Sequence, residues 1–194
     1  MTEQLAARLA EVLPYAAVST VHAVTTADVA RERWVEAVLA VRDDDLLDGS
    51  FFDVLLAVDE HPAGFDVVVR LWSVGSRHGF HLRTRCPRED ARIPSLTGAF
   101  GGAAWHEREA AEMLGIAFEG HPALTPLLLP DGLAGQHPLR KERVLVARAG
   151  PWPGAVDPAD RPGRAVNRRL RPLGSPPPAL PAAPLPQPGP EQRP

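Results

Sequence analysis

The stretch WHEREAAE, residues 105–112, has histidine and glutamate side chains at spacings that metal chemistry uses. His106 and Glu107 begin the pattern H-E-x-x-H, in which two histidines one helical turn apart bind zinc and the glutamate acts as general base. The fifth position is Ala110, so the second ligand is missing. His121 and His137 are possible distant ligands, but each precedes a proline and neither has a paired ligand at metal spacing. We therefore expect no metal site.

Two carboxylates of the same stretch, Glu109 and Glu112, lie three residues apart beside Arg108. A buried pair of this kind can carry out acid–base catalysis, whereas a pair on a solvated helix face interacts with neighbouring charges. A free-standing hydrolase would use His106, Glu109 and His121. The sequence contains no nucleophile elbow, phosphate-binding loop or dinucleotide-binding glycine motif, so we expect no catalytic residue.

The size and composition point to one domain with an appendage. The chain has 194 residues and a formal net charge of −3, which favours no particular partner and does not suggest a nucleic-acid-binding protein. Its one cysteine, Cys86, excludes an internal disulfide, a Cys-rich zinc site and a four-Cys iron–sulfur site. A single cysteine within an apolar strand pattern is usually buried, and we expect that here.

The elements that must position these side chains can be predicted from periodicity. Strands are expected at 16–24, 51–59, 65–73 and 79–86. Helices are expected near residues 5–13, at 27–41 behind a cap at Thr25 or Thr26, and at 104–114 before the left-handed Gly115. Short links between the last three strands favour an antiparallel meander. The predicted fold class is α+β, with a small, mixed and mostly antiparallel sheet of about four strands and three helices.

Residues 119–148 form a different kind of segment, which we call the strap. It contains two His-Pro dipeptides, the run Leu127, Leu128 and Leu129, and several prolines that exclude a helix or a central strand. It is also too apolar for an ordinary solvated loop, so we expect a partner surface to cover it. The predicted organisation is a domain at 1–118, the strap, and a tail at 149–194.

The tail is expected to be disordered, since it holds 14 of the chain's 22 prolines and almost no large apolar residues. Its arginine-rich stretch 161–172 could touch lipid headgroups or an acidic surface, but it lacks the interleaved aromatic residues typical of RNA binding. The N-terminus does not resemble a secretory signal, and no run approaches ~18 apolar residues. We expect the protein to face the cytoplasm and to reach a membrane only through other subunits.

The stretch WHEREAAEMLGIAFEGHPAL, followed by a leucine-rich segment and HPLRK, resembles the signature of the C-type subunit of NADH–quinone oxidoreductase, respiratory complex I. The resemblance covers about residues 50–141 and includes FFDVLLAVD, FDVVVRLWS, FHLRTRC and IPSLTGAF. The chain departs from the family pattern in several places: Glu112 replaces Asp, Leu114 replaces Phe, Thr125 and Pro126 replace two basic residues, and Gln136 is extra. The stretch ERVLV also follows HPLRK in place of the usual acidic-aromatic-proline ending.

The resemblance implies a non-catalytic subunit of the hydrophilic arm that supports assembly around the quinone-proximal subunits, peripheral to the cytoplasmic side of the cell membrane. It implies no cofactor on this chain, within a complex that uses FMN, iron–sulfur clusters and quinone. The alternatives are the equivalent subunit of a membrane-bound hydrogenase, or of a related assembly that lacks the NADH-input module. The residues expected to bind partners are Glu107, Arg108, Glu109, His121, Pro122, His137, Pro138, Leu139, Arg140 and Lys141.

We expect the purified protein to be colourless and to hold neither stoichiometric metal nor flavin, because one cysteine and scattered histidines cannot build a cluster or a closed zinc site. Absorbance spectra and metal content after mild purification test this expectation. A near-stoichiometric metal that survives treatment with a chelator would contradict it.

Overall fold

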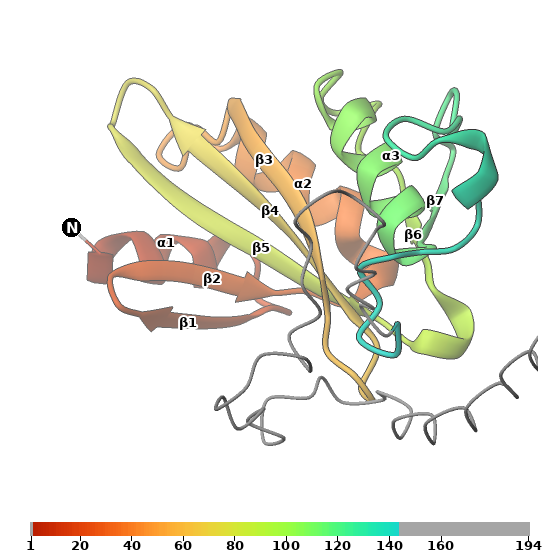
Figure 1. Ribbon diagram of the computed structural model, residues 1–194. Coiled ribbons are helices and arrows are strands. Elements are labelled where there is room, and N and C mark those ends of the chain that lie inside the picture. Colours follow the sequence, from red (N-terminus) through yellow and green to blue (C-terminus); the bar gives the residue numbers. More distant parts are fainter. Residues whose placement is uncertain (1, 144–194) are drawn as a thin grey trace, which may run out of the picture. The chain divides into compact units, whose positions relative to one another are not determined.

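The computed structural model describes residues 2–143, and it divides the chain into one compact unit up to Arg140 and a second unit from Lys141 onward. The first unit is an α+β domain, as predicted (Figure 1). Its α-helices are α1 (Thr2–Val12), α2 (Trp34–Asp43) and α3 (Ala103–Leu114). Its strands are β1 (Ala17–Val21), β2 (Val24–Asp28), β3 (Phe51–Asp59), β4 (Phe65–Ser73), β5 (His78–Cys86), β6 (Arg92–Pro94) and β7 (Ala117–Glu119). Three 3-10 turns complete it: η1 (Arg31–Arg33), η2 (Arg88–Asp90) and η3 (Asp131–Leu133).

The main sheet has five strands in the order β1-β2-β5-β4-β3. Strands β3, β4 and β5 form the predicted antiparallel meander, and the first two have the predicted bounds. Strand β2 pairs with β5 in parallel, which makes the sheet mixed. The chain between β2 and β3 therefore carries α2 across one face of the sheet.

The prediction for residues 16–28 was wrong in one respect. A single strand was expected at 16–24 with a helix cap at Thr25 or Thr26, but the segment is a hairpin of β1 and β2. The turn between them consists of His22 and Ala23, with φ angles of 49° and 64°. Two residues in the left-handed region give the turn whose twist matches a hairpin, but they are usually Asn or Gly. Thr25 is buried within β2, and α2 begins only at Trp34.

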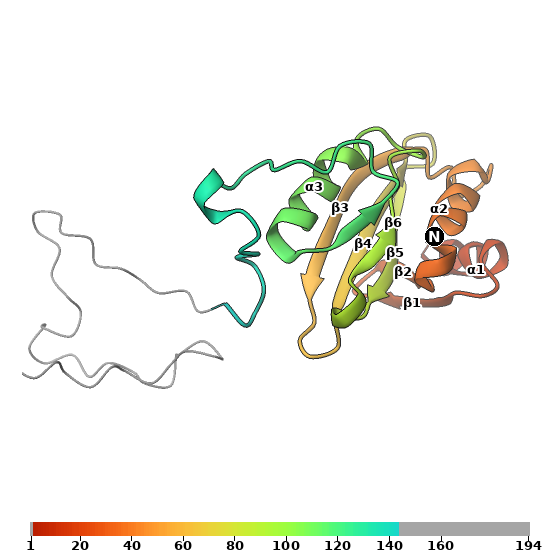
Figure 2. The same ribbon diagram turned by 90° about the vertical axis from the view of Figure 1, so that its right-hand side faces the viewer.

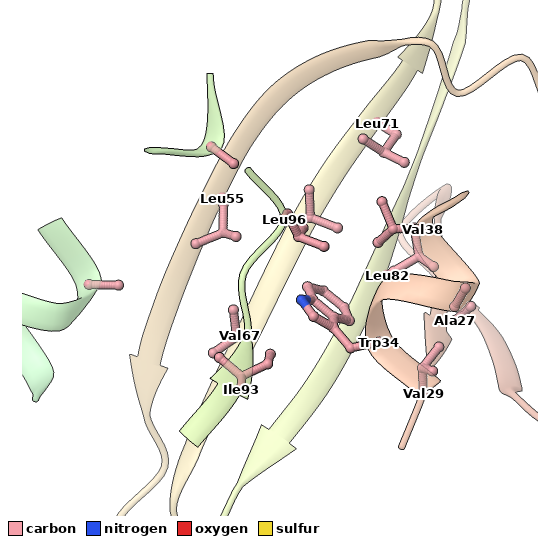
Figure 3. Close-up of a cluster of buried hydrophobic side chains, with 14 of the residues drawn as sticks. Ala27, Val29, Trp34, Val38, Leu55, Val67, Leu71, Leu82, Ile93 and Leu96 are labelled. Carbon is pink, nitrogen blue, oxygen red and sulfur yellow. The ribbon is translucent and has the colours of Figure 1, made fainter. Parts of the chain in front are cut away.

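The core lies between one face of the main sheet and the helices. In β4 the buried apolar residues alternate along the strand: Phe65, Val67, Val69 and Leu71. Trp34 of α2 sits among core side chains that also come from the strands and from the segment around β6 (Figure 3). Helices α1, α2 and α3 all contribute buried residues to this one cluster, so they cover the same face of the sheet (Figures 1 and 2). Cys86 is buried in β5, as expected.

A second, two-stranded sheet positions the end of α3 and the start of the strap. Strands β6 and β7 are parallel, and Ile93 lies opposite Phe118, with both side chains buried. Neither strand was predicted, because each has only three residues and pairs across a long sequence separation. Helix α3 connects the two strands, so its direction and the point where the strap begins are set together (Figure 2).

Replacing Trp34 by alanine should destabilise the domain by about 3–5 kcal/mol, because the side chain is completely buried and its removal leaves a cavity. Chemical denaturation of the full-length protein measures the change. The control Trp105→Ala removes an indole that is 61% exposed and should cost less than ~1 kcal/mol. Similar losses for the two variants would contradict the assignment of Trp34 to the core.

Candidate functional site

The outer face of α3 and the described part of the strap form the candidate site. Trp105, Arg108, Glu109 and Glu112 recur at helical spacing on this face. The helix ends at Gly115, whose φ of 75° is the left-handed conformation predicted for it, and Ile116 then folds back into the core. The strap leaves β7 and loops along the outer side of α3 (Figures 1 and 2).

The Glu112 side chain fixes the middle of the strap to α3. Its carboxylate accepts three consecutive backbone N–H groups, from Leu127 at 3.3 Å, Leu128 at 2.6 Å and Leu129 at 3.0 Å. Burial opposes ionisation, but the three donors and the nearby Arg108 guanidinium outweigh it and hold the pKa of Glu112 below its usual range. The carboxylate thus replaces the partner strand that this stretch of backbone lacks.

The Arg108 side chain holds the preceding part of the strap. Its Nε donates to the carbonyl oxygen of Thr125 at 2.9 Å, and Nη2 donates to that of Pro126. The guanidinium also lies over the Trp105 ring, 5.1 Å from the centroid. Arg108 and Glu112 are therefore complementary, since one binds strap carbonyls and the other binds strap amides.

Residues 137–140 of the strap cap the C-terminus of α3. A helix leaves its last carbonyl oxygens without intrahelical donors. Here the backbone carbonyl oxygen of Glu112 accepts a hydrogen bond from His137 Nδ1 at 2.9 Å. The carbonyl oxygen of Met113 accepts from the backbone N–H of Leu139 at 3.2 Å, and the carbonyl oxygen of Leu114 accepts from Arg140 Nε at 2.7 Å. Three orphan acceptors are thus satisfied by one short segment.

Gly115 makes this close approach possible. A Cβ atom at this position would lie 2.5 Å from Arg140 Nη2 and 2.7 Å from His137 Nε2. The Arg140 guanidinium also reaches the ring of Phe65, 5.4 Å from its centroid, and so joins the end of the strap to β4. Arg140 is among the residues expected to bind a partner, and in the structure its Nε donates to the carbonyl oxygen of Leu114 in α3 of the same chain.

Glu107 faces the opposite way and is completely buried. Its carboxylate accepts from the Ser95 hydroxyl and from the backbone N–H of Leu96, both at 2.6 Å. Burial raises the pKa of Glu107, although these two donors and His121 favour the charged form. Glu107 therefore holds the turn before α3 against the helix. Because its side chain is completely buried, it offers no surface for direct contact with a partner.

The three residues of the hydrolase hypothesis, His106, Glu109 and His121, lie in different local environments. His106 packs with its ring edge against Phe52, at a centroid distance of 5.4 Å. His121 Nε2 donates to the carbonyl oxygen of Ala104, while Nδ1 accepts from the N–H of Ala123, so both ring nitrogens are used locally. Glu109 is exposed. Within residues 2–143, no group of three or more His, Cys, Asp or Glu side chains is arranged to hold a metal ion.

The remaining residues expected to bind partners lie on or near the strap. Pro122 is exposed and Pro138 is half-buried, while Leu139 is 61% exposed. Lys141 is exposed and belongs to the second unit. The outer face of α3 and the strap as far as residue 143 together expose five large apolar side chains: Trp105, Leu124, Leu128, Leu133 and Leu139. We call these five the apolar strap surface. Large apolar side chains that an ordered segment exposes to solvent are candidates for contact with a protein partner.

Glu112 was predicted only as one of a possible acid–base pair and not as one of the partner-binding residues. The only sequence signal was that Glu replaces the Asp of the resembled signature, which lengthens the side chain by one methylene group. Nothing in the local pattern indicates that its carboxylate binds backbone amides 15 to 17 residues away. Among residues 2–143, the structure contains no helix with the length and apolarity needed to cross a bilayer.

Comparison with known families gives a match over most of the chain. The family model described as "Respiratory-chain NADH dehydrogenase, 30 Kd subunit" matches residues 27–149. The C-type subunit of NADH-quinone oxidoreductase from Roseiflexus castenholzii is 40% identical over 118 residues, which are 60% of this chain and 67% of that protein. Its counterpart from Mycolicibacterium gilvum is 35% identical over 148 residues, or 73% and 64%. The counterpart from Thermus thermophilus, which is numbered as the fifth subunit, is 42% identical over 98 residues, or 48% and 47%. The matches span about half to two thirds of these relatives.

Two solved structures share the fold. A trypsin-resistant fragment of Nqo5 superposes with a TM-score of 0.55 at 26% identity, over 63% of this chain and 99% of the fragment. A chain of the membrane-bound sulfane sulfur reductase, an archaeal respiratory membrane complex, superposes with a TM-score of 0.61 at 25% identity, over 72% of this chain and 84% of that chain.

Replacing Glu112 by glutamine should loosen the strap, because an amide accepts through one oxygen only and its NH₂ group faces backbone donors. Hydrogen exchange at the amides of Leu127, Leu128 and Leu129 should become several-fold faster. A lowered folded-state pKa means that the carboxylate stabilises the strap above the usual Glu value of about 4.3 and ceases to do so as the pH falls through the lower folded-state value. After correction for the pH dependence of intrinsic amide exchange, the protection of these three amides in the wild type should therefore fall at acidic pH.

The matched control is Glu109→Gln, one turn earlier on the same helix and exposed to solvent. It should leave the exchange of the three leucine amides unchanged. Equal effects of the two substitutions would show that the charge of the helix, and not the contact of Glu112, holds the strap.

Proposed function

We propose that this chain, which belongs to the family of the 30 Kd subunit of respiratory-chain NADH dehydrogenase, serves as a non-catalytic hydrophilic-arm subunit of a proton-translocating NADH–quinone oxidoreductase. In this role it supports the assembly of the quinone-proximal subunits, through which electrons pass from NADH to quinone. The observation that carries the proposal is the apolar strap surface, which an ordered backbone displays to solvent. The relatives that are named as C-type subunits of NADH-quinone oxidoreductase support it.

The strap chemistry favours binding over catalysis. Three polar side chains of this site are engaged in holding the strap: Arg108 binds carbonyls, Glu112 binds amides and His137 caps a helix. FMN, the iron–sulfur clusters and quinone then belong to other subunits of the parent complex. This chain contributes a shaped surface to that complex.

The partners in this proposal are the neighbouring hydrophilic-arm subunits. The contact residues retained from the sequence are Arg108, Glu109, His121, Pro122, His137, Pro138, Leu139, Arg140 and Lys141. In this proposal the exposed members touch the partner directly, whereas Arg108, His137 and Arg140 act by fixing the strap. The chain would sit at the cytoplasmic side of the cell membrane and be held there by these subunits.

A second candidate is the equivalent subunit of a related membrane complex that lacks the NADH-input module or couples to a hydrogenase. The likeness to a chain of the archaeal sulfane sulfur reductase complex favours it. Purification of the intact complex distinguishes the two candidates, because NADH-oxidising flavoprotein subunits accompany the chain only in the first.

The double substitution Leu128→Lys and Leu139→Lys tests the proposed surface. These side chains are 59% and 61% exposed, so the melting temperature should change little. Burying two lysines against an apolar partner is unfavourable, and recovery of the assembled complex should fall at least about tenfold, since single interface anchors are often worth more than 1 kcal/mol. Affinity purification with subunit identification measures recovery.

The matched control is Val21→Lys with Val74→Lys, which changes side chains of 61% and 64% exposure away from the strap. It should assemble like the wild type. Normal assembly of the strap variant, or equal loss in the control, would exclude the apolar strap surface as the contact.

A further inference from the structure

A hollow of about 310 Å³ opens between α3 and the strap, within the unit that ends at Arg140. Its walls come from the second half of α3, from residues 115–117 just after it, and from two stretches of the strap, residues 124–126 and Ala134, Gly135 and His137. The volume is at the lower end for a small-molecule site, and it suits one large side chain of a partner. Protein interfaces commonly concentrate binding energy in a pocket of this kind, filled by Trp, Tyr or Arg.

The charges around the hollow argue against an ionic occupant. The Arg108 guanidinium already donates to two strap carbonyls, and the Glu112 carboxylate already accepts from three strap amides. A partner that brought a charge into the hollow would lose hydration without meeting an uncommitted opposite charge. Much of the remaining wall is apolar and includes Ala111, Ile116 and Leu124. These features favour a neutral and mostly apolar side chain.

His137 adds a hydrogen-bond acceptor to this apolar wall. Its Nδ1 lies 2.9 Å from the carbonyl oxygen of Glu112, which can only accept, so Nδ1 carries the proton. In the neutral ring Nε2 is then an acceptor. This atom lies on the Gly115 side of the ring, where a Cβ on the glycine would be 2.7 Å away, and both residues line the hollow.

We propose that the hollow receives one tyrosine or tryptophan side chain of the docked protein partner, whose O–H or N–H donates to His137 Nε2 while its ring packs on the apolar wall. Such residues have an apolar body and a single polar tip, which matches a wall of this composition. This inference rests on the proposed function, because it names the partner side chain that would anchor the strap surface.

Side-chain analogues test the recognition directly on the full-length protein. p-Cresol stands for tyrosine and toluene for phenylalanine, each titrated against ¹⁵N-labelled protein. p-Cresol should shift the amide signals of residues 134–137 in a saturable way and bind about two- to tenfold more tightly than toluene, the ratio expected for one hydrogen bond. Equal binding of the two would overturn the role of His137, and no saturable shift with either would overturn the site.

Filling the hollow tests it in the complex. Ala134→Trp and Ala117→Trp each place an indole at an exposed alanine that lines the hollow, and Ala123→Trp places the same side chain on an exposed strap position outside it. Melting temperatures should match that of the wild type for all three. The first two variants should abolish p-cresol binding and reduce recovery of the complex at least about tenfold, whereas Ala123→Trp should do neither.

Normal assembly of both filling variants would overturn the proposed anchor. If Leu128→Lys with Leu139→Lys still prevents assembly in that case, the proposed function stands without the anchor. If neither class of variant affects assembly, the strap is not the docking surface and the proposed function fails with it.

Discussion

The exposed end of a helix is the constraint on which this part of the molecule depends. Helix α3 finishes at Gly115 with carbonyl oxygens that no intrahelical donor can reach, and the strap has backbone amides that no neighbouring strand can pair. Each of the two segments supplies hydrogen-bond partners for the unpaired backbone groups of the other. His137, the amide of Leu139 and Arg140 satisfy the helix, while Glu112 satisfies the strap. The strap is therefore fixed to α3 at residues 127–129 and again at residues 137–140, although its described part contains no long regular element and buries little apolar surface.

This arrangement explains how a segment without a core of its own can present an interface. Ordering a free chain on binding costs about 1–2 kcal/mol per residue in backbone entropy. In this protein, polar contacts to the strap backbone already order it during folding, so much of that entropy is lost before binding. The side chains of Leu124, Leu128, Leu133 and Leu139 remain exposed to solvent. A partner then meets a shaped apolar surface, as in interfaces that bind with little rearrangement. The apolar strap surface and the polar contacts that hold it thus have separate roles.

The sequence predicted what local patterns control. Alternation along β3, β4 and β5 predicted the meander, and Gly115 predicted the end of α3. The β1–β2 hairpin was missed because its turn uses His22 and Ala23, which carry no turn signal. The site was only partly predictable for a related reason. Arg108 and His137 were recognised as site residues from the family signature, but the bonds of Glu112 join positions that only the folded chain brings together.

Glu107 and Glu112 show how two carboxylates of one helix can join it to different segments of the chain. They lie on opposite sides of α3, and each carboxylate binds donors of a different segment. Glu107 faces inward to the turn at Ser95 and Leu96, and burial raises its pKa. Glu112 faces outward, where three backbone amides and Arg108 outweigh partial burial and lower its pKa. A catalytic pair needs two carboxylates that share a substrate and titrate apart in one cleft. The pKa values of Glu107 and Glu112 differ here because each carboxylate joins α3 to a different part of the chain. The two glutamates therefore act as structural links between segments.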